Sequence, residues 1–296
     1  VAGGQSQVLI QFYYDDNDYW GWYWAVDDVK INEADQYDLK NEGIYWGHTG
    51  NIGTRVPYYQ VPLDQVVAYD VSGRVQNMGY EDQTDVEYTA AVASEGFTSV
   101  SNASTVLGFE TDTVDCNSQF TPSGLGWYQF DGTVTSGATD AVPADNAFVG
   151  ADSMNVTEFI YARDAWNADG AFFPEVSFEG GNLFDINQDV DIYGIDAGFG
   201  GSLAAGIEVY GTLYEIDANG DFAYIAETEI YTTIAGDETT MRTFKFENEQ
   251  TLTAGTTYMI TLGSFSTELS LAVSGNSPDQ TSFLYGDLGT GGVDWY

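Results

Sequence analysis

The sequence predicts an all-β protein made of tandem β-sandwich domains. Short apolar segments alternate with polar residues over most of the 296 positions, and they are rich in valine, isoleucine, threonine, tyrosine and phenylalanine. Glycine, asparagine and aspartate separate these segments at regular spacing, which is typical of short sandwich strands joined by turns. Helical periodicity is almost absent, because four glycines interrupt the one region with such a pattern, residues 186–205.

The N-terminal segment, residues 1–32, holds two strand patterns, QVLIQFYYDD and YWGWYWAVDDVKI. They are expected to pair as a β-hairpin across Asn17. An isolated hairpin is marginally stable in water, so this hairpin is expected to belong to a further sandwich. Residues 33–58 are polar, rich in glycine and without period, and are predicted to be a connector.

Residues 59–170 are predicted to form an Ig-like sandwich. In VVAYDVSGRVQNMG, apolar positions alternate with polar ones from Val67 to Val75, which places the apolar side chains on one face of a strand. A turn follows at residues 77–79. In TPSGLGWYQFDG, the aromatic residues Trp127, Tyr128 and Phe130 are expected to form core on one face and an edge on the other. Further strands are expected at 86–93, 104–109, 126–134 and 145–163.

Residues 171–296 are predicted to form a second, jelly-roll-like sandwich. Its clearest hairpin is YGTLYEIDANGDFAYIAE, in which Asn219 and Gly220 are expected at the centre of a type I′ turn. The segments TLTAGTTYMITLGSF and TELSLAVSG continue the sheet. The strand pattern runs up to Tyr296 without a closing turn, so this sandwich is expected to be incomplete at its C-terminus.

The charge balance argues against two classes of partner. Acidic residues number 46 against 7 basic ones, for a formal net charge of −39. Such a surface repels phosphate backbones and anionic lipid, which predicts no nucleic-acid partner, and no apolar run reaches the ~18 residues of a bilayer span. The acidity fits salty surroundings, where screening weakens self-repulsion, and a chain that collects divalent cations. The single cysteine, Cys116, excludes an internal disulfide framework.

Catalytic residue types are scarce. The one histidine, His48, lies in the glycine-rich sequence YWGHTG and is interpreted as a loop residue, and no GxSxG nucleophile motif is present. A pair of carboxylates could serve glycoside hydrolysis, but with 46 acids the sequence singles out no pair. The composition therefore predicts a protein that is not an enzyme and requires no cofactor.

Three segments resemble modules of secreted Bacteroidetes proteins. FYYDDNDYWGWYWAVDDVKI is similar to the closing strands of cleaved-adhesin and MAM-like jelly rolls. PYYQVPLDQVVAYDVSGRVQNMGYEDQTDVEYTAAV resembles the Ig-like module that often follows them, and the segment with TLTAGTTYMITL and GDLGTGGVDWY is similar to the β-sandwich that comes third. The resemblance implies a surface protein exported by the type IX system, and O-glycosylation of Asp-Ser/Thr-apolar tripeptides at Thr113 and Ser153.

Calcium is the metal that the acidic clusters favour. Carboxylates that meet across a hairpin supply the hard oxygen ligands of Ca²⁺, which takes about six to eight of them. Solvated turn acids are the competing interpretation. In Asp217-Ala-Asn-Gly-Asp221 the glycine stands at the wrong place for an EF-hand loop, so a hairpin turn is expected there. The two candidate sets are Asp15, Asp16, Asp18, Asp27 and Asp28, and Asp185, Asp189, Asp191 and Asp196.

The tryptophans of the first segment allow two interpretations. Trp20, Trp22 and Trp24 share one face of a strand, where they can pack against a core or a neighbouring module, or stack on sugar rings of a glycan.

The favoured function is a non-catalytic extracellular structural or adhesive protein that self-associates or binds neighbouring sandwich modules. In one form of this hypothesis the hairpin completes the sandwich of another copy, and copies link into a filament. The alternative is a set of glycan- or substrate-binding modules belonging to a larger secreted hydrolase.

Overall fold

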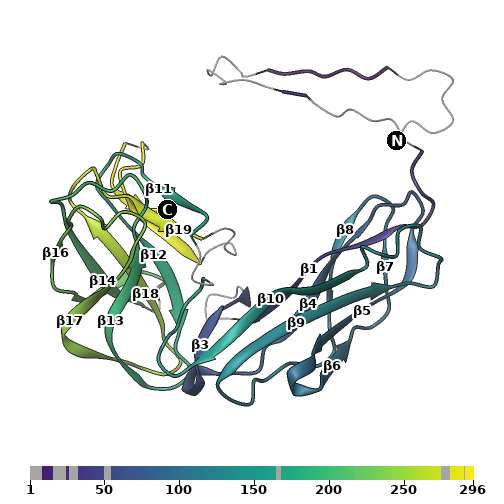
Figure 1. Ribbon diagram of the computed structural model, residues 1–296, viewed down its shortest axis with the longest axis horizontal. Coiled ribbons are helices and arrows are strands. Elements are labelled where there is room, and N and C mark those ends of the chain that lie inside the picture. Colours follow the sequence, from purple (N-terminus) through teal and green to yellow (C-terminus); the bar gives the residue numbers. More distant parts are fainter. Residues whose placement is uncertain are drawn as a thin grey trace. The chain divides into compact units, whose positions relative to one another are not determined.

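The computed structural model describes residues 9–15, 25–26, 33–49, 55–164, 168–217, 219–274, 281–289 and 291–296. The chain divides into two units, Val1–Ala34 and Asp35–Tyr296. Within the described residues the regular structure consists of β-strands and two short 3₁₀ turns, so the predicted all-β class is confirmed (Figure 1). Most of the hairpin predicted in residues 1–32 lies outside the described residues. No helix in the described ranges has the length and apolarity needed to span a membrane.

Two facing sheets build the first sandwich of the second unit. The strands pair antiparallel throughout, except that β3 runs parallel to β10. One sheet has the order β2-β1-β4-β8, with β1 Leu39–Thr49, β2 Arg55–Val56, β4 Asp70–Asn77 and β8 Thr111–Asp115. The other has the order β3-β10-β9-β5-β6 with β7 beside β5, where β3 is Gln60–Pro62, β5 Gln83–Val92, β6 Phe97–Val100, β7 Ser104–Val106, β9 Gly126–Thr135 and β10 Ala147–Thr157.

Tyr88 fills the middle of this sandwich. Its ring is fully buried between Gly73 of β4 and Gly132 of β9, and its hydroxyl lies within hydrogen-bonding distance of the Asn41 side chain. Glycine is needed at both strand positions because a Cβ atom would overlap the tyrosine side chain. The predicted alternation holds along β4 for the buried Val71, Gly73 and Val75, but Ser72, expected on the outer face, is also buried. It is confirmed along β9, where Tyr128 is buried and Trp127 is 62% exposed.

The connector prediction for residues 33–58 is wrong where β1 forms. Strand β1 runs from Leu39 to Thr49 and pairs with β4 over most of its length. A β-bulge between Asn41 and Gly43 shifts the register, so buried side chains do not alternate with a constant period. Asn41 is buried although polar, because its side chain donates to the carbonyl of Gly132 at 3.1 Å and accepts from the amide of Gly43 at 3.1 Å. The bulge and the buried amide hide the strand pattern.

The second sandwich contains a curled sheet. Phe222 and Trp295 come from strands at opposite ends of the sheet order, yet their ring centroids are 4.4 Å apart, so the sheet bends back on itself. The order is β15-β14-β18-β12-β20-β21 with β16 beside β14, where β12 is Phe178–Asp185, β14 Glu208–Ile216, β15 Phe222–Glu227, β16 Tyr231–Thr232, β18 Thr257–Ser264, β20 Ser282–Gly286 and β21 Asp294–Trp295. Two further pairs are β13 Val190–Gly198 with β17 Met241–Leu252, and β11 Gly170–Phe172 with β19 Leu271–Val273.

The hairpin predicted between β14 and β15 is confirmed, but its turn differs from the prediction. The amide of Gly220 donates to the carbonyl of Asp217 at 3.0 Å, so Asn219 and Gly220 are the third and fourth residues of the turn and not its centre. Gly220 has a left-handed φ of 85°, which closes a longer hairpin loop. The Asp217 carboxylate accepts the amides of Asn219 and Asp221 at 2.8 and 2.9 Å, and these bonds lower its pKa.

The two sandwiches meet at a buried junction around Tyr58. The Tyr58 hydroxyl accepts the backbone amide of Asp185 at 2.9 Å, and its ring packs 4.4 Å from that of Tyr161. The guanidinium carbon of Arg163 lies 4.7 Å from the Tyr58 ring centroid, while its Nε donates to the carbonyl of Leu183 at 2.6 Å. Phe184 of β12 belongs to the same hydrophobic cluster as the core of the first sandwich.

Gln65 adds a second polar contact at the junction. Gln65 is 1% exposed, and its side-chain amide both accepts from and donates to backbone groups of the turn after β12. Its Oε1 accepts the amides of Asn187 and Gln188 at 2.9 and 3.3 Å, and its Nε2 donates to the carbonyl of Gln188 at 2.9 Å. The Asn187 side chain donates in return to the Gln65 carbonyl at 2.8 Å. The Gln65 side chain therefore provides hydrogen-bond partners for two backbone amides and one carbonyl of the neighbouring sandwich.

Replacing Gly73 by alanine is expected to lower the free energy of unfolding by about 2 kcal/mol or more, because overpacking forces side chains from their preferred positions. The new Cβ would lie 1.9 Å from the Tyr88 ring. Urea unfolding of the full chain measures the effect. Gly124→Ala is the control, since nothing lies within 4 Å of its added Cβ. Equal stability of both variants would show that Tyr88 does not pack against Gly73.

Gln65→Ala is expected to loosen the junction and to cost about 2 kcal/mol, because three hydrogen bonds are lost and two amides of the partner turn are left without acceptors. Hydrogen exchange read by mass spectrometry should show faster exchange of the segment containing Asn187 and Gln188. Gln76→Ala, a half-buried glutamine on β4, is the matched control and should leave that segment unchanged. Unchanged exchange in the Gln65 variant would contradict the role given to this side chain.

Candidate metal centre

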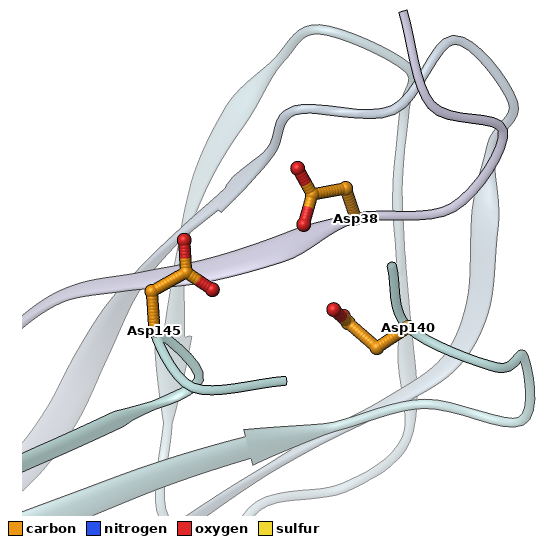
Figure 2. Close-up of side chains that lie close together, drawn as sticks. All are labelled: Asp38, Asp140 and Asp145. Atoms are coloured by element: carbon orange, nitrogen blue, oxygen red, sulfur yellow. The ribbon is translucent and has the colours of Figure 1, made fainter. Parts of the chain in front are cut away.

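Three aspartates converge at one end of the first sandwich. Asp38 comes directly before β1, while Asp140 and Asp145 lie in the loop between β9 and β10. Each offers an oxygen, and these oxygens all lie within 4.8 Å of one another. Figure 2 shows the three carboxylates facing a common space from two separate parts of the chain. Among the described residues, no other group of three or more histidine, cysteine, aspartate or glutamate side chains meets so closely.

Backbone hydrogen bonds hold this arrangement in place. The Asp140 carboxylate accepts the amides of Leu39 and Val142, each at 2.8 Å, and so ties the start of β1 to the loop. Two main-chain hydrogen bonds also join the loop to the segment around β1. The Ala141 amide donates to the Tyr37 carbonyl at 2.9 Å, and the Asp145 carbonyl accepts the Asn41 amide at 3.0 Å. These bonds hold the Asp140 carboxylate in place and bring the backbone segments of Asp38 and Asp145 together.

The electrostatics of the three aspartates are unfavourable for three ionised groups alone. Asp38 is 8% exposed, and this burial raises the pKa of its carboxyl, with Asp140, Asp145 and Asp35 adding repulsion of the same sign. One buried oxygen of Asp38 and one of Asp145 have no hydrogen-bond partner. None of the ion pairs found among the described side chains involves these three residues.

This chemistry suits a small hard cation or a shared proton. Carboxylate oxygens are the preferred ligands of Ca²⁺ and Mg²⁺, and a cation removes the mutual repulsion that burial makes costly. The cluster therefore has the oxygen ligand set of a hard-metal centre.

Local sequence patterns do not single out this group. Asp38 stands about a hundred positions before Asp140 and Asp145, and it falls within the predicted connector. The one local signal is DAVPAD, in which two aspartates flank a proline-containing loop that returns into a strand. Pairing of β1 next to β4, together with the loop bonds, brings Asp38 to that loop.

The first predicted calcium set cannot be placed as a group. Asp16, Asp18, Asp27 and Asp28 lie outside the described residues, as do Trp20, Trp22 and Trp24. Asp15 is described, and its carboxylate accepts the Tyr13 hydroxyl at 3.0 Å. The proposed calcium and glycan contacts of this segment stay predictions.

The second predicted set is not gathered into one cluster. Asp189, Asp191 and Asp196 accept separately from the Ala254 amide, the Thr251 hydroxyl and the Thr243 hydroxyl, at 2.8, 2.6 and 2.5 Å. Asp185 is buried at the junction, where it accepts the hydroxyl of Thr257. The geometry therefore lends no support to a shared calcium site of these four aspartates.

His48 lies at the end of β1 and not in a loop, which corrects the interpretation from the sequence. Its side chain is largely buried, with its ring 6.0 Å from that of Tyr58, and its Nε2 is 3.7 Å from the Asp185 carboxylate. That distance is longer than a hydrogen bond. Both ring nitrogens are buried without a partner among the described residues, so His48 belongs to the junction between the sandwiches.

The two predicted O-glycosylation acceptors occupy different environments. Thr113 is exposed on β8, the outermost strand of its sheet. Ser153 is half-buried on β10 between Asp152 and the fully buried Met154. Access for a glycosylating enzyme is therefore better at Thr113. Modification of either residue stays a prediction.

No protein-family model matches the sequence, and no curated protein matches it. The fold and the site geometry are therefore the observations on which a function can be argued.

Asp152→Asn is expected to stabilise the protein at neutral pH but not in acid. Burial raises the pKa of Asp152 to about 6, so the folded state holds this proton more tightly than the unfolded chain does. Stability from this group is therefore lost as pH rises from about 4 to about 6, and the loss remains above that range. We expect a gain of about 1 kcal/mol at pH ~7.5 and almost none near pH ~3.5, since solvent screens a half-buried carboxylate.

Urea unfolding of wild type and variant at both pH values measures this gain as a difference, so effects of the other acids cancel. Asp64→Asn changes an exposed aspartate and is the control. A gain of the same size at both pH values would contradict the assignment to Asp152.

Proposed function

We propose that this chain is a non-catalytic extracellular β-protein with a structural or adhesive role, which self-associates through residues 1–34. The observation that carries the proposal is the exposure of apolar side chains in this first unit. Leu9 is 89% exposed, Tyr13 is 74% exposed, and Ile10 is also exposed. Leaving several large apolar side chains of one short segment in water is unfavourable, and such segments mark interaction sites.

Strand addition is the mode of association that the fold favours. The described residues 9–15 form no strand of their own, and they lie in a unit separate from the sandwiches. The first sandwich presents an edge strand, β8, which is the last strand in the order of the four-stranded sheet. An extended segment that pairs with such an edge gains main-chain hydrogen bonds, while its alternate apolar side chains bury in the receiving sandwich.

The junction around Tyr58 supports a mechanical role. It fixes the two sandwiches to each other through buried aromatic packing and hydrogen bonds to backbone groups. A pair of sandwiches joined in this way transmits force better than two domains on a flexible linker. Export to the outside of the cell belongs to the same proposal, and its support is the acidic composition, which fits salty surroundings.

A double substitution, Leu9→Asp with Ile10→Asp, is expected to abolish assembly while leaving the sandwiches folded. It places two charges in the segment that would be buried in the neighbouring copy. Light scattering after size-exclusion chromatography and negative-stain microscopy measure the assemblies of native material. Leu125→Asp, at an exposed leucine just before β9, is the control and should assemble like wild type. A wild-type chain that stays monomeric at high concentration would refute self-association.

A further inference from the structure

We propose that Asp38, Asp140 and Asp145 bind a calcium ion, and that this ion fastens together the two sheets of the first sandwich. The site lies wholly within residues 35–296, so it is independent of how the chain self-associates.

The buried oxygens without partners are the observation that points to a ligand. Asp38 is more than nine-tenths buried, and its Oδ1 has neither a hydrogen-bond donor nor a basic side chain beside it. Asp145 Oδ1 is also buried and has no hydrogen-bond partner. Buried polar atoms almost always have partners, because leaving one unpaired costs about 1–3 kcal/mol and more for a charged group. Figure 2 shows both carboxylates directed toward the space that they share with Asp140.

The spacing of the oxygens fits a calcium ion. Two oxygens 4.8 Å apart can each stand at about 2.4 Å from one ion, which is the usual Ca²⁺–oxygen distance, and three oxygens within this range reach it when they move slightly closer together. Mg²⁺ needs shorter bonds and a nearly ideal octahedron, and it gives up water reluctantly. Three carboxylates held by one loop and the start of a strand form an irregular set, which calcium accepts more readily. Water molecules would complete its coordination.

The position of the site defines what the ion would do. Asp38 precedes β1, which belongs to the four-stranded sheet, whereas Asp140 and Asp145 belong to the loop joining β9 and β10 of the other sheet. An ion bound by all three would therefore link the sheets at this end of the sandwich. The link would also anchor the chain only a few residues after Ala34, where the first unit ends.

A shared proton and a general attraction of cations each predict a result different from that of a calcium site. A proton shared among the carboxyl groups would satisfy the orphan oxygens without any metal, so calcium would then have no specific effect. General attraction of cations by the net charge of −39 would stabilise the protein regardless of which carboxylates are removed. A specific site requires both selectivity for calcium and dependence on these three side chains.

The experiment compares thermal unfolding of the full chain in EDTA and in ~1 mM CaCl₂ with ~0.15 M KCl, which screens exposed charges. We expect calcium to raise the midpoint of wild type by about 5 °C or more. The double substitution Asp38→Asn with Asp145→Asn should abolish this rise. Asp112→Asn with Asp115→Asn removes two exposed carboxylates from β8 of the same sandwich and should keep it.

A second measurement keeps the test decisive where the variant folds poorly. Titration calorimetry of the wild-type chain with CaCl₂ should show one specific site, and hydrogen exchange should slow in residues 37–41 and 141–146 when calcium is present. In EDTA the Asp38/Asp145 variant should unfold at or above the wild-type midpoint, because buried like charges have been removed. The proposal is overturned if wild type gains nothing from calcium or if the double variant gains as much. An equal rise with ~1 mM MgCl₂ would overturn the choice of calcium.

Discussion

The buried phenol of Tyr58 is the point on which the arrangement of the sandwiches depends. It lies between β2 and β3 of the first sandwich, yet its hydroxyl accepts the amide of Asp185 at the end of β12 in the second. Burial raises the pKa of Tyr58, so the phenol stays neutral in this apolar cluster. Arg163 covers the ring, and Tyr161 and Phe184 pack against it. Two sandwiches that share such a cluster behave as one folded body.

The scarcity of cations shapes how this protein satisfies its acids. With 7 basic residues for 46 acidic ones, few carboxylates can have an ion-pair partner. Arg242 pairs with the buried Asp237, and Arg74 pairs with Glu42 on the outer face of the four-stranded sheet. Many other acids accept hydrogen bonds from amides or threonine hydroxyls, as Asp191 and Asp196 do. Asp38 stands out because burial, repulsion from neighbouring acids and an unpartnered oxygen occur together in one carboxylate.

The candidate site shows where prediction from the sequence ends. Acids that are close along the chain, such as those from Asp185 to Asp196, suggest a common site, but the strands distribute them to different hydrogen-bond partners. The acids that do meet come from two distant segments, because β1 enters the sandwich beside the β9–β10 loop. The strand that delivers Asp38 is itself hard to predict, since its bulge and its buried Asn41 break the apolar period.

The amino-acid sequence by itself determined the fold class, most of the strands and the acidic, cation-poor surface. These features follow from local periodicity and composition, as the buried alternation along β9 and the hairpin around Gly220 show. Only the tertiary structure decided which residues meet. The burial of Asn41, the fit of Tyr88 between two glycines and the convergence of Asp38 with Asp140 and Asp145 all depend on strand register and on sheet-to-sheet packing. Such long-range contacts leave no periodic signal in one sequence, because the residues that make them are separated by whole strands.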